Sequence, residues 1–531
     1  MKKIFLILLA MPFAVTLTSC MEDADVTAYM TEDKKEEIAA QDPDKVFSAI
    51  VSGMYNDMQQ YVDTDMSHNY FGQKSFDYLT SLMGNDMIMT GRFAMSLYHY
   101  MLDYWGQNYI PTSNRWREYY RAIDNANQIL KSIDPADTDP AVLRYKAIAL
   151  GFRGYAYLQL TYLYQYSYYV GADDTKWGKG AKYDHSEDLC VPIVTETITG
   201  QQPRSTVKQV YAQLMSDLKT SYDLFEELGM VKTSSPTDMD GCVVAMHLAR
   251  ANMVIHEWTD ALKYAQVVID NFSVLTTEDQ ITQGFSNITL PDIVFGCDIT
   301  SDNSTTYMSW FSQMDVYGDG YAGIGVWRAA FGPFVDKIAD GDVRLKWFCC
   351  DRSTGVDDGE GGRVTLLRDL EDPAYVEYQS VKFIGTGREN IKNGVFEGWE
   401  VGDYIYLRSE EAYLMKAEIL AHQSSADAVT VLNDFMKTRN PDYSYTFTNK
   451  ADLIEEINFQ KRVEFWGEGI EYLDNRRLNI PVDRTDATWP TGNNHLSGAK
   501  LKADQEDRCF LYQLPTSEIE NNEMISADQQ N

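Results

Sequence analysis

The chain has 531 residues, of which 13% are aromatic, and a formal net charge of −33. This acidic balance disfavours a nucleic-acid-binding protein, because binding to the phosphate backbone requires a basic surface. The hydrophobic content of 44%, with only 15 Pro and 34 Gly, permits a large core and excludes a disordered, fibrous or low-complexity chain.

The first twenty residues are typical of a lipoprotein signal peptide. Two lysines precede the apolar segment 4–15, which is too short to cross a bilayer as a helix. The ending L-T-S-C at Cys20 resembles the bacterial lipobox, in which the cysteine is lipidated and becomes the first mature residue. We therefore predict a signal peptide over 1–19 and a lipid anchor on Cys20. An ordinary secretory signal with a chance cysteine is the alternative.

Residues 20–41 are expected to form a polar, lipid-anchored tether. The acidic residues Glu22, Asp23 and Asp25 directly follow the lipidation site and resemble the surface-export signal of Bacteroidetes lipoproteins. The alternative is a solvated linker without a signal. No later stretch is long and apolar enough to span a bilayer. We therefore expect the mature chain to be anchored to the membrane by its N-terminus, outside the cytoplasm.

Helical periodicity dominates the rest of the chain. Apolar residues recur at intervals of three and four in the segments 43–61, 116–133, 140–166 and 205–228. Residues that favour the ends of helices mark the expected boundaries: Ser113 or Asn114, Asp139 before Pro140, and Ser205 at the starts, with Pro135 and Gly229 as stops.

Two further segments, 241–270 and 411–437, predict helical hairpins. Each has small residues at helical spacing around a short turn, and small residues allow two antiparallel helices to approach closely. The pattern resembles a tetratricopeptide hairpin of about 34 residues. The two copies lie far apart in the sequence, so they do not form a tandem array, and other elements must complete the helical stack.

Residues 273–400 differ from the helical segments, since they are rich in Gly, Asp and aromatic residues. Short β-like runs occur at 292–297 and 381–384, and the composition of 351–363 predicts an exposed loop. Loops held on a rigid scaffold are common binding elements. We therefore expect residues 273–400 to contain the ligand-binding region.

Cysteines and acidic clusters give little support for a metal or cofactor site. The cysteines after Cys20 form no CxxC and have spacings unlike a zinc site, so we expect mostly buried free thiols. The acidic loops 315–319 and 357–360 are candidates for Ca²⁺, but neither matches an EF-hand, and solvated loops are the simpler interpretation. The sequence contains no HExxH, no GxSxG and no P-loop GxxxxGK(S/T) motif.

Six blocks, in order, resemble those of the SusD/RagB family of outer-membrane nutrient-binding lipoproteins. They include W-R-E-Y-Y-R-A-I-D-N-A-N, L-C-V-P-I-V-T, L-R-S-E-E-A-Y-L and L-Y-Q-L-P-T-S-E-I. The blocks cover nearly the whole mature chain: 116–127, 144–164, 189–195 with 204–218, 407–418, 461–477 and 511–519. Two departures are Gly154, where the family usually has Ala, and Lys461, where it usually has Glu.

The resemblance implies a mainly α fold, a tetratricopeptide-like scaffold within one SusD-like domain over 42–531. The scaffold is assigned to 42–272 and 401–480, the variable ligand-binding region to 273–400, and a C-terminal segment to 481–531. Such proteins capture an oligosaccharide, or another nutrient such as a peptide, at the cell surface. They pass it to a SusC-like TonB-dependent transporter, without catalysis or a cofactor. A lipid-anchored glycoside hydrolase and a strand-rich pilus subunit are the alternatives from other classes.

Aromatic and polar residues are the candidates for the binding site, because sugars offer apolar ring faces and hydroxyl groups. In the family, a tryptophan in the loop before the 116–133 helix stacks on glycan, which makes Trp105 the first candidate, with Tyr104 and Asn108 beside it. The family's second aromatic cluster and its frequent polar contacts correspond to these residues: Trp310, Tyr317, Tyr321, Trp327, Asp86 and Arg92. For each, packing within the domain is the alternative role.

Seven tyrosines between Tyr155 and Tyr169 also suggest a binding surface. Their helical spacing instead favours a packed core face whose hydroxyl groups reach water or the backbone. We therefore predict a structural role for this stretch.

Overall fold

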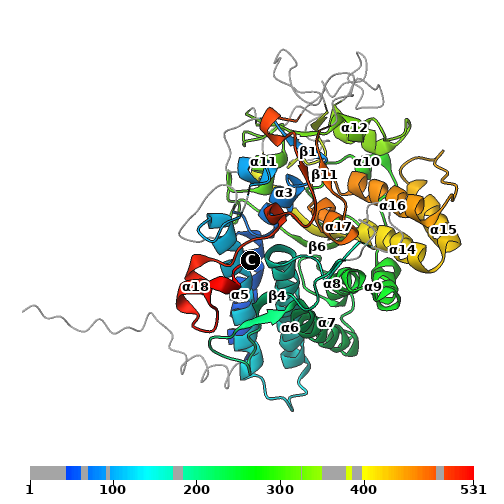
Figure 1. The fold of residues 1–531 in the computed structure, drawn as a ribbon. Helices are drawn as coiled ribbons and strands as arrows, with labels where there is room; N and C mark the ends of the chain where they lie inside the picture. The colour runs from blue at the N-terminus through cyan, green and yellow to red at the C-terminus, as the bar shows by residue number, and fades with distance from the viewer. Residues whose placement is uncertain are drawn as a thin grey trace, which may run out of the picture.

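The computed structural model describes residues 43–60, 70–90, 96–103, 105–171, 183–324, 326–349, 378–385, 398–485 and 495–531. The fold is mainly helical, as predicted, and several small antiparallel sheets lie beside the helices (Figure 1). Within these ranges, no helix combines the length and apolar character needed to cross a membrane.

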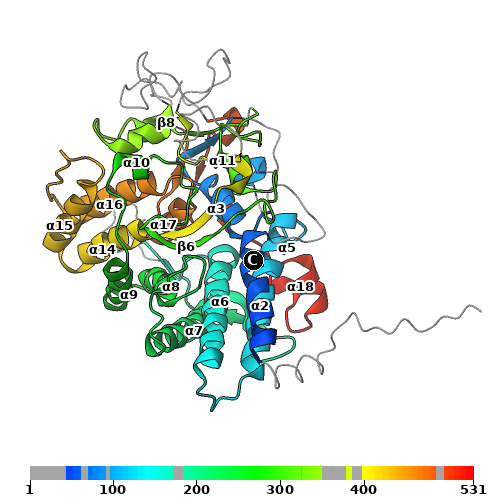
Figure 2. The ribbon, with the colours of Figure 1, turned by 180° about the vertical axis from the view of Figure 1, so that it is seen from behind.

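Helices form the first half of the scaffold. They are α2 (Pro43–Gln59), α3 (Gln73–Ser81), α4 (Leu97–Tyr100), α5 (Ile110–Ser132), α6 (Pro140–Tyr164), α7 (Val207–Glu227), α8 (Gly241–Val254) and α9 (Trp258–Asn271). Helix α6 packs between α5 and α7, and α2 lies against α5 and α6 (Figure 1, Figure 2).

Local sequence explains where two of these helices begin. At the start of α6, the Asp139 carboxylate accepts a hydrogen bond of 2.8 Å from the Ala141 N–H, so the predicted boundary is confirmed. At the start of α7, Thr206 and Gln209 form a capping box, so the prediction of Ser205 as the cap is wrong by one residue. Ser205 instead belongs to a short strand that pairs before the helix starts.

The two predicted hairpins are confirmed. The first consists of α8 and α9, and the second of α14 (Ser409–Gln423) and α15 (Ser425–Met436). Helix α9 packs against α14, which brings the two hairpins together although 272–408 lie between them in the sequence. Helices α16 (Lys450–Glu464) and α17 (Ile470–Leu478) continue the stack from α14.

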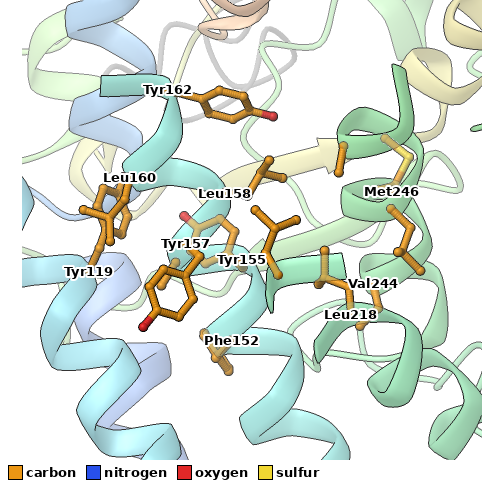
Figure 3. Close-up of a cluster of buried hydrophobic side chains, with 14 of the residues drawn as sticks. Tyr119, Phe152, Tyr155, Tyr157, Leu158, Leu160, Tyr162, Leu218, Val244 and Met246 are labelled. Carbon is orange, nitrogen blue, oxygen red and sulfur yellow. The ribbon is translucent and has the colours of Figure 1, made fainter. Parts of the chain in front are cut away.

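Helix α6 is the centre of the scaffold. Every residue from Ala147 to Tyr164 is buried, as expected for a helix covered on all sides. Figure 3 shows Tyr155 and Tyr157 beside aliphatic side chains of this core. The Tyr157 hydroxyl donates to the Val194 carbonyl oxygen at 2.8 Å. The structural role predicted for this stretch is confirmed for the tyrosines within α6.

Gly154 lies at the contact between α6 and α7. A Cβ atom at this position would lie 2.6 Å from Leu218 Cγ and 3.2 Å from the Leu214 carbonyl oxygen. Real Cβ atoms do not approach side-chain carbons this closely. An alanine methyl group would not fit at this position, which explains why this chain has glycine where the resemblance predicts alanine.

The largest sheet joins the N-terminal part of the chain to the variable region. Its strands are antiparallel in the order β1 (Met87–Met89), β7 (Arg328–Ala330), β9 (Gln379–Ser380) and β8 (Phe348–Cys349). A second sheet pairs β6 (Ile293–Cys297) with β10 (Tyr404–Arg408), so the strand predicted at 292–297 is confirmed. The strand predicted at 381–384 is wrong, because pairing ends at Ser380 and the next residues turn into the core.

The remaining elements are short. The other two-stranded sheets are β2 (Tyr169–Val170) with β3 (Tyr183–Asp184), β4 (Leu189–Pro192) with β5 (Arg204–Thr206), and β11 (Val482–Asp483) with β12 (Lys502–Ala503). The short α-helices are α10 (Glu278–Ile281), α11 (Trp310–Met314), α12 (Gly332–Val335) and α18 (Thr516–Asn521). The 3₁₀ helices are η1 (Val343–Trp347), η3 (Trp399–Val401), η4 (Ser497–Ala499), η5 (Arg508–Phe510) and η6 (Ala527–Gln529).

Charged residues of the family-like blocks pair with one another inside the fold. The two Asp217 oxygens accept from Arg153 at 2.8 and 2.7 Å, which joins α6 to α7. Other buried pairs join the blocks of the second half: Arg408–Glu464, Arg408–Glu468 and Arg477–Glu418. Because a buried charge without a partner is costly, loss of one member of any of these pairs should destabilise the fold.

Four cysteines are free thiols in the part of the chain that the structure describes. Cys190 and Cys242 are buried, as predicted, whereas Cys297 and Cys509 are half-buried. The predictions for the side chains of the remaining cysteines and for the loops 351–363 and 357–360 lie outside the described residues.

Candidate functional site

A cavity of about 240 Å³ lies at the N-terminal end of α5, and we call it the Trp105 cavity. Aromatic rings form much of its wall, with one carboxyl and one amide side chain: Tyr70, Tyr98, His99, Trp105, Tyr109, Asp103 and Asn108. The structure thus brings together Trp105 and Asn108, two residues predicted to bind ligand. Tyr104, predicted beside them, lies outside the described residues.

The first turn of α5 forms part of the cavity wall. The helix begins at Ile110, earlier than predicted, and Pro111 lies in its first turn, where its fixed φ and missing N–H are tolerated. Ser113 and Asn114 therefore lie inside the helix, and their prediction as N-caps is wrong. The additional turn brings Ile110 and Pro111 to the cavity.

The C-terminal segment holds the loop that carries Trp105. The Gln513 N–H donates to the Trp105 carbonyl oxygen at 3.0 Å, and the Thr516 N–H donates to the Gln107 carbonyl oxygen at 3.1 Å. Helix α18 lies beside α5 in both views (Figure 1, Figure 2). The family-like block at 511–519 therefore fixes the backbone of the candidate site.

Trp105 is a wall of the cavity. Its side chain is 2% exposed. Its ring lies 4.1 Å from the His99 ring, with 31° between the planes, and 5.5 Å from the Tyr512 ring, measured between centroids. The ring is thus packed among other aromatic rings, and it is less accessible than the stacking role predicted for it requires.

Two tyrosines that the sequence analysis did not select provide the accessible aromatic surface. Tyr98 and Tyr109 line the cavity, and each is 53% exposed. Large exposed rings of this kind are typical of recognition surfaces, because they offer contact area at a small entropic cost. Their position on either side of the Trp105 loop, outside any apolar helix face, is the sequence feature that indicates exposed rings near the site.

The cavity has an acidic and neutral lining. No Lys or Arg is among the described residues that line it, whereas Asp103 contributes an exposed carboxyl group. Burial, assisted by the positive charge of Arg115, lowers the pKa of His99 to about 3, so its imidazole is neutral at physiological pH. This electrostatic setting disfavours anionic ligands.

Two residues of the second predicted aromatic cluster, Trp310 and Tyr317, lie in the hydrophobic core. Trp310 is 1% exposed and contacts Phe383 edge-on, with ring centroids 5.0 Å apart, while the Lys74 ammonium lies 4.0 Å from its ring centroid. Tyr317 is also buried. Neither ring faces solvent in this structure, because both pack within the hydrophobic interior.

Tyr321 and Trp327 are the half-buried members of that cluster. Trp327 packs against a small group of buried residues that includes Val316 and Val381. Its carbonyl oxygen accepts a hydrogen bond of 3.2 Å from the Thr90 side chain, so it lies beside the end of β1. A role for Tyr321 and Trp327 in ligand binding stays a prediction.

Asp86 has a structural partner that the sequence analysis did not identify. Its carboxylate accepts from Arg462 Nε at 2.7 Å and from Arg462 Nη2, and the residue is 2% exposed. Asp86 thus has a structural role in this fold, and its contact with ligand stays a prediction. Arg92, predicted with Asp86, lies outside the described residues, as does Cys20.

The acidic loop 315–319 was expected to be solvated, which is wrong for Asp315. This residue is 1% exposed, and its two oxygens accept from the Tyr317 N–H at 2.8 Å and the Gly385 N–H at 2.9 Å. The carboxylate thus holds the backbone at Tyr317 and the backbone at Gly385 together. Among the described residues, no group of three His, Cys, Asp or Glu side chains is arranged to hold a metal ion.

Two smaller cavities lie inside the scaffold. Each measures about 30 Å³, one beside Arg250 and Arg477 and the other beside Gln159 and His247. This is room for a water molecule, so these cavities do not compete with the Trp105 cavity as ligand sites.

Two family models match the chain. A SusD-like model described as starch-binding and associating with the outer membrane matches residues 32–236, and the model of the SusD family matches residues 374–531. No curated protein matches the chain.

Solved structures with the same fold come from Bacteroides species. A SusD-like carbohydrate binding protein from Bacteroides vulgatus is 24% identical, with a TM-score of 0.71, over 91% of this chain and 97% of that chain. A SusD superfamily protein from Bacteroides thetaiotaomicron is 19% identical, with a TM-score of 0.68, over 92% and 99%. Surface glycan-binding protein A from Bacteroides uniformis is 14% identical, with a TM-score of 0.62, over 92% and 99%. At these identities the likeness shows the fold.

Proposed function

The chain belongs to the SusD family, and on this premise we propose that it is a surface lipoprotein of the outer membrane that binds an oligosaccharide in the Trp105 cavity. It delivers the bound sugar to a SusC-like TonB-dependent transporter. The chain is organised as one domain over 42–531, with the lipid on Cys20 and the tether 20–41 leading to the first helix.

The observation that supports this function is the aromatic cavity itself. Sugar rings present apolar C–H faces, which pack on exposed rings such as Tyr98 and Tyr109, and hydroxyl groups, which pair with polar side chains such as Asn108. The cavity volume of about 240 Å³ suits one small ring of a longer ligand. The remaining sugar units would lie on the surface beside it.

Binding agrees with the lining better than hydrolysis does. Glycoside hydrolysis uses two carboxyl groups placed about 5–10 Å apart on either side of the scissile bond. Asp103 is the one carboxyl group among the described lining residues. The described lining therefore lacks the second carboxyl group that a glycoside hydrolase needs. A reducing-sugar assay on each candidate ligand tests directly for hydrolysis.

Titration calorimetry on the purified mature protein tests the ligand class. The panel contains neutral hexasaccharides of glucose, xylose, mannose and galactose, an oligogalacturonate, and a peptide mixture. Binding of at least one neutral oligosaccharide supports the proposal. Binding of peptides with no response to any sugar would contradict it and would favour a SusD-like binder of another nutrient.

Extraction of outer membranes with mild detergent tests the delivery step. If the protein works with a SusC-like transporter, it should co-purify with a large β-barrel protein from its own organism. Recovery of the protein alone, under conditions that keep other membrane complexes intact, would count against the partnership.

A further inference from the structure

A buried cluster of charged side chains joins the variable region to the helical scaffold. Ion pairs connect five carboxyl groups, those of Asp292, Asp342, Glu410, Glu464 and Glu468. Their cationic partners are Arg344, Lys382, Arg408 and Arg439. None of these side chains is more than 10% exposed. We call this set the Arg408 cluster, because Arg408 pairs with four of its carboxyl groups.

The Arg408 cluster has one carboxyl group more than it has cations. With all members ionised, five negative and four positive charges leave a net charge of −1 in the protein interior. Lys74 also lies near Glu468, but it brings its own partner, Asp77, at 3.1 Å, and so leaves the balance unchanged. Because an uncompensated buried charge is costly, one proton bound by a carboxyl group completes the balance.

Asp292 is the carboxyl group that lacks donors. The other four accept hydrogen bonds from nitrogen atoms, in these donor–acceptor pairs: Arg344–Asp342 at 2.8 Å, Arg439–Glu464 at 2.8 Å, Lys382–Glu468 at 2.6 Å and the Leu275 N–H with Glu410 at 2.9 Å. Among the described residues, neither carboxyl oxygen of Asp292 has a hydrogen-bond partner, although both are buried. Arg408 Nη1 lies 3.9 Å from Oδ2, beyond hydrogen-bond distance.

Glu410 is the neighbour that can accept a proton from Asp292. Its Oε1 accepts from the Leu275 N–H and from Arg439, whereas the buried Oε2 has no described donor in hydrogen-bond geometry, with Arg408 Nη1 3.5 Å away. Burial raises the pKa of Asp292 well above its usual value. The charge of Glu410 and a hydrogen bond between the two carboxyl groups raise it further, while the charge of Arg408 opposes them.

We propose that Asp292 holds a proton in the folded protein and donates it to Glu410 Oε2, so that the protonated pair completes the charge balance of the Arg408 cluster. Asp292 precedes β6 in the variable region, and Glu410 belongs to α14 of the scaffold. The proton therefore acts as a structural ligand at the junction of these two regions. The junction is weakened when the pH rises far enough to remove it.

The raised pKa of Asp292 determines the sign of the pH dependence. Between the unfolded pKa of about 3.9 and the folded value, the folded state binds a proton that the unfolded state lacks. This stabilisation is complete below about pH 3.9 and is lost as the pH rises through the folded value. Arg408 and Arg439, the cations that face the pair, stay charged throughout. Burial lowers the pKa of Lys382 to about 8, so measurements from about pH 5 to about pH 7.5 avoid its titration.

Asp292→Asn mimics the protonated side chain, because the amide is neutral, has nearly the same shape and can donate to Glu410. In urea unfolding of the mature protein, this variant should be at least as stable as the wild type at about pH 7.5. Its unfolding equilibrium constant, relative to that of the wild type, should fall as the pH rises, by up to about tenfold per pH unit.

Asp342→Asn is the matched control, the same substitution within the same cluster. The two Asp342 oxygens accept from Arg344 at 3.0 and 2.8 Å, so the substitution leaves a buried guanidinium group without its charged partner. We expect this variant to be less stable than the wild type over the whole pH range.

Infrared spectroscopy provides a readout that a merely structural role would not change. At about pH 7.5, the wild type should show the carbonyl band of a protonated carboxyl group, and carbon-13 labelling of aspartate should shift that band. Asp292→Asn should lose this band, whereas Asp342→Asn should retain it.

A stable Asp292→Asn variant whose advantage grows with pH, together with loss of the band, supports the proposal. If this variant fails to fold or loses as much stability as Asp342→Asn, Asp292 is ionised and pairs with Arg408, and the proposal is overturned. An advantage that does not change with pH would also overturn it, as would a labelled wild type without a protonated aspartate band at about pH 7.5.

Discussion

Arg462 forms a two-point ion pair with Asp86, a residue 376 positions earlier in the chain, with Nε donating to Oδ2 at 2.7 Å. The indole N–H of Trp466 also donates to the Asp86 carbonyl oxygen at 3.1 Å. Asp86 directly precedes β1, and Arg462 belongs to α16, so the pair connects the main sheet to the second half of the helical scaffold.

Asp86→Ala should destabilise the fold. The substitution leaves the Arg462 charge without its partner, which costs about 2–4 kcal/mol when most of the side chain is buried. Urea unfolding measures the loss. The double variant Asp86→Ala with Arg462→Met should recover part of it, because the orphaned charge is then removed as well. A loss of glycan affinity without a loss of stability would show instead that Asp86 contacts ligand.

Gly154→Ala should also destabilise the protein, although alanine is the better helix former. The new Cβ would overlap Leu218 Cγ at 2.6 Å, and the resulting overpacking costs about 1–3 kcal/mol, more than the gain of up to 1 kcal/mol in helix propensity. Gly53→Ala is the matched control within α2, since its Cβ would meet nothing within 4 Å. That variant should be more stable by about 0.5–1 kcal/mol. Equal effects of the two substitutions in thermal unfolding would refute the argument.

Tyr98→Ala and Tyr109→Ala should each weaken binding of the neutral oligosaccharide. Loss of one stacked ring costs about 1–2 kcal/mol, which corresponds to roughly a five- to thirtyfold increase in Kd. Tyr307→Ala is the control, because this tyrosine is 47% exposed and does not line the cavity. Unchanged affinity in both cavity variants, with native unfolding temperatures, would mean that sugars bind elsewhere.

His185 should make stability depend on pH. Burial alone would lower its pKa, but hydrogen bonds to Glu506 and to Asp188, the latter at 2.7 Å, outweigh burial and raise the pKa above its usual value. The protonated form is therefore favoured in the folded state. Its stabilisation is fully present below the unfolded pKa of about 6.5 and is lost as the pH rises through the folded value.

His185→Gln removes this contribution. The unfolding temperature of the variant should lie below that of the wild type at about pH 5.5, and the difference should shrink towards about pH 9. Glu506→Gln should reduce the same pH dependence in part, because it removes the charge of one of the two acceptors. A difference that grows with pH would have the wrong sign for this explanation.

Cys20→Ser should prevent lipidation. Metabolic labelling with a fatty acid should mark the wild-type protein and Cys297→Ser, which retains the lipobox, but not Cys20→Ser. The variant should leave the membrane fraction in salt washes that retain the wild type. Labelling of Cys20→Ser would place the lipid on another residue.

The sequence predicts those parts of the fold that depend on local periodicity. The hairpin at α8 and α9 is found over Gly241–Asn271, against the predicted 241–270, because small residues recur at helical spacing on both helices. Helix α5 starts before the predicted position because Pro111 is tolerated in the first turn, where its missing N–H leaves no helical hydrogen bond unmade. The short strands around β9 depend on pairing between distant segments, which no local pattern encodes.

The candidate site was predictable only in part. The family resemblance predicts Trp105 and Asn108 but not Tyr98 and Tyr109, because the exposure of a tyrosine side chain is set by tertiary packing. Burial of Trp310 and the pairing of Asp86 depend on contacts with Lys74 and Arg462, which are distant in the sequence. Residue type identified candidates, and tertiary packing decided which of them face a cavity.

The contact between α9 and α14 forms late in the folding of the chain. Arg250 of α8 pairs with Glu411 of α14 at 2.6 Å, and Lys416 of α14 donates to the Gln266 side chain of α9 at 2.8 Å. During synthesis, α8 and α9 emerge well before α14, and the closure of so long a loop slows folding. Until α14 arrives, the face of the first hairpin that it will cover stays exposed. This partly formed helical stack is therefore the intermediate in which aggregation should begin.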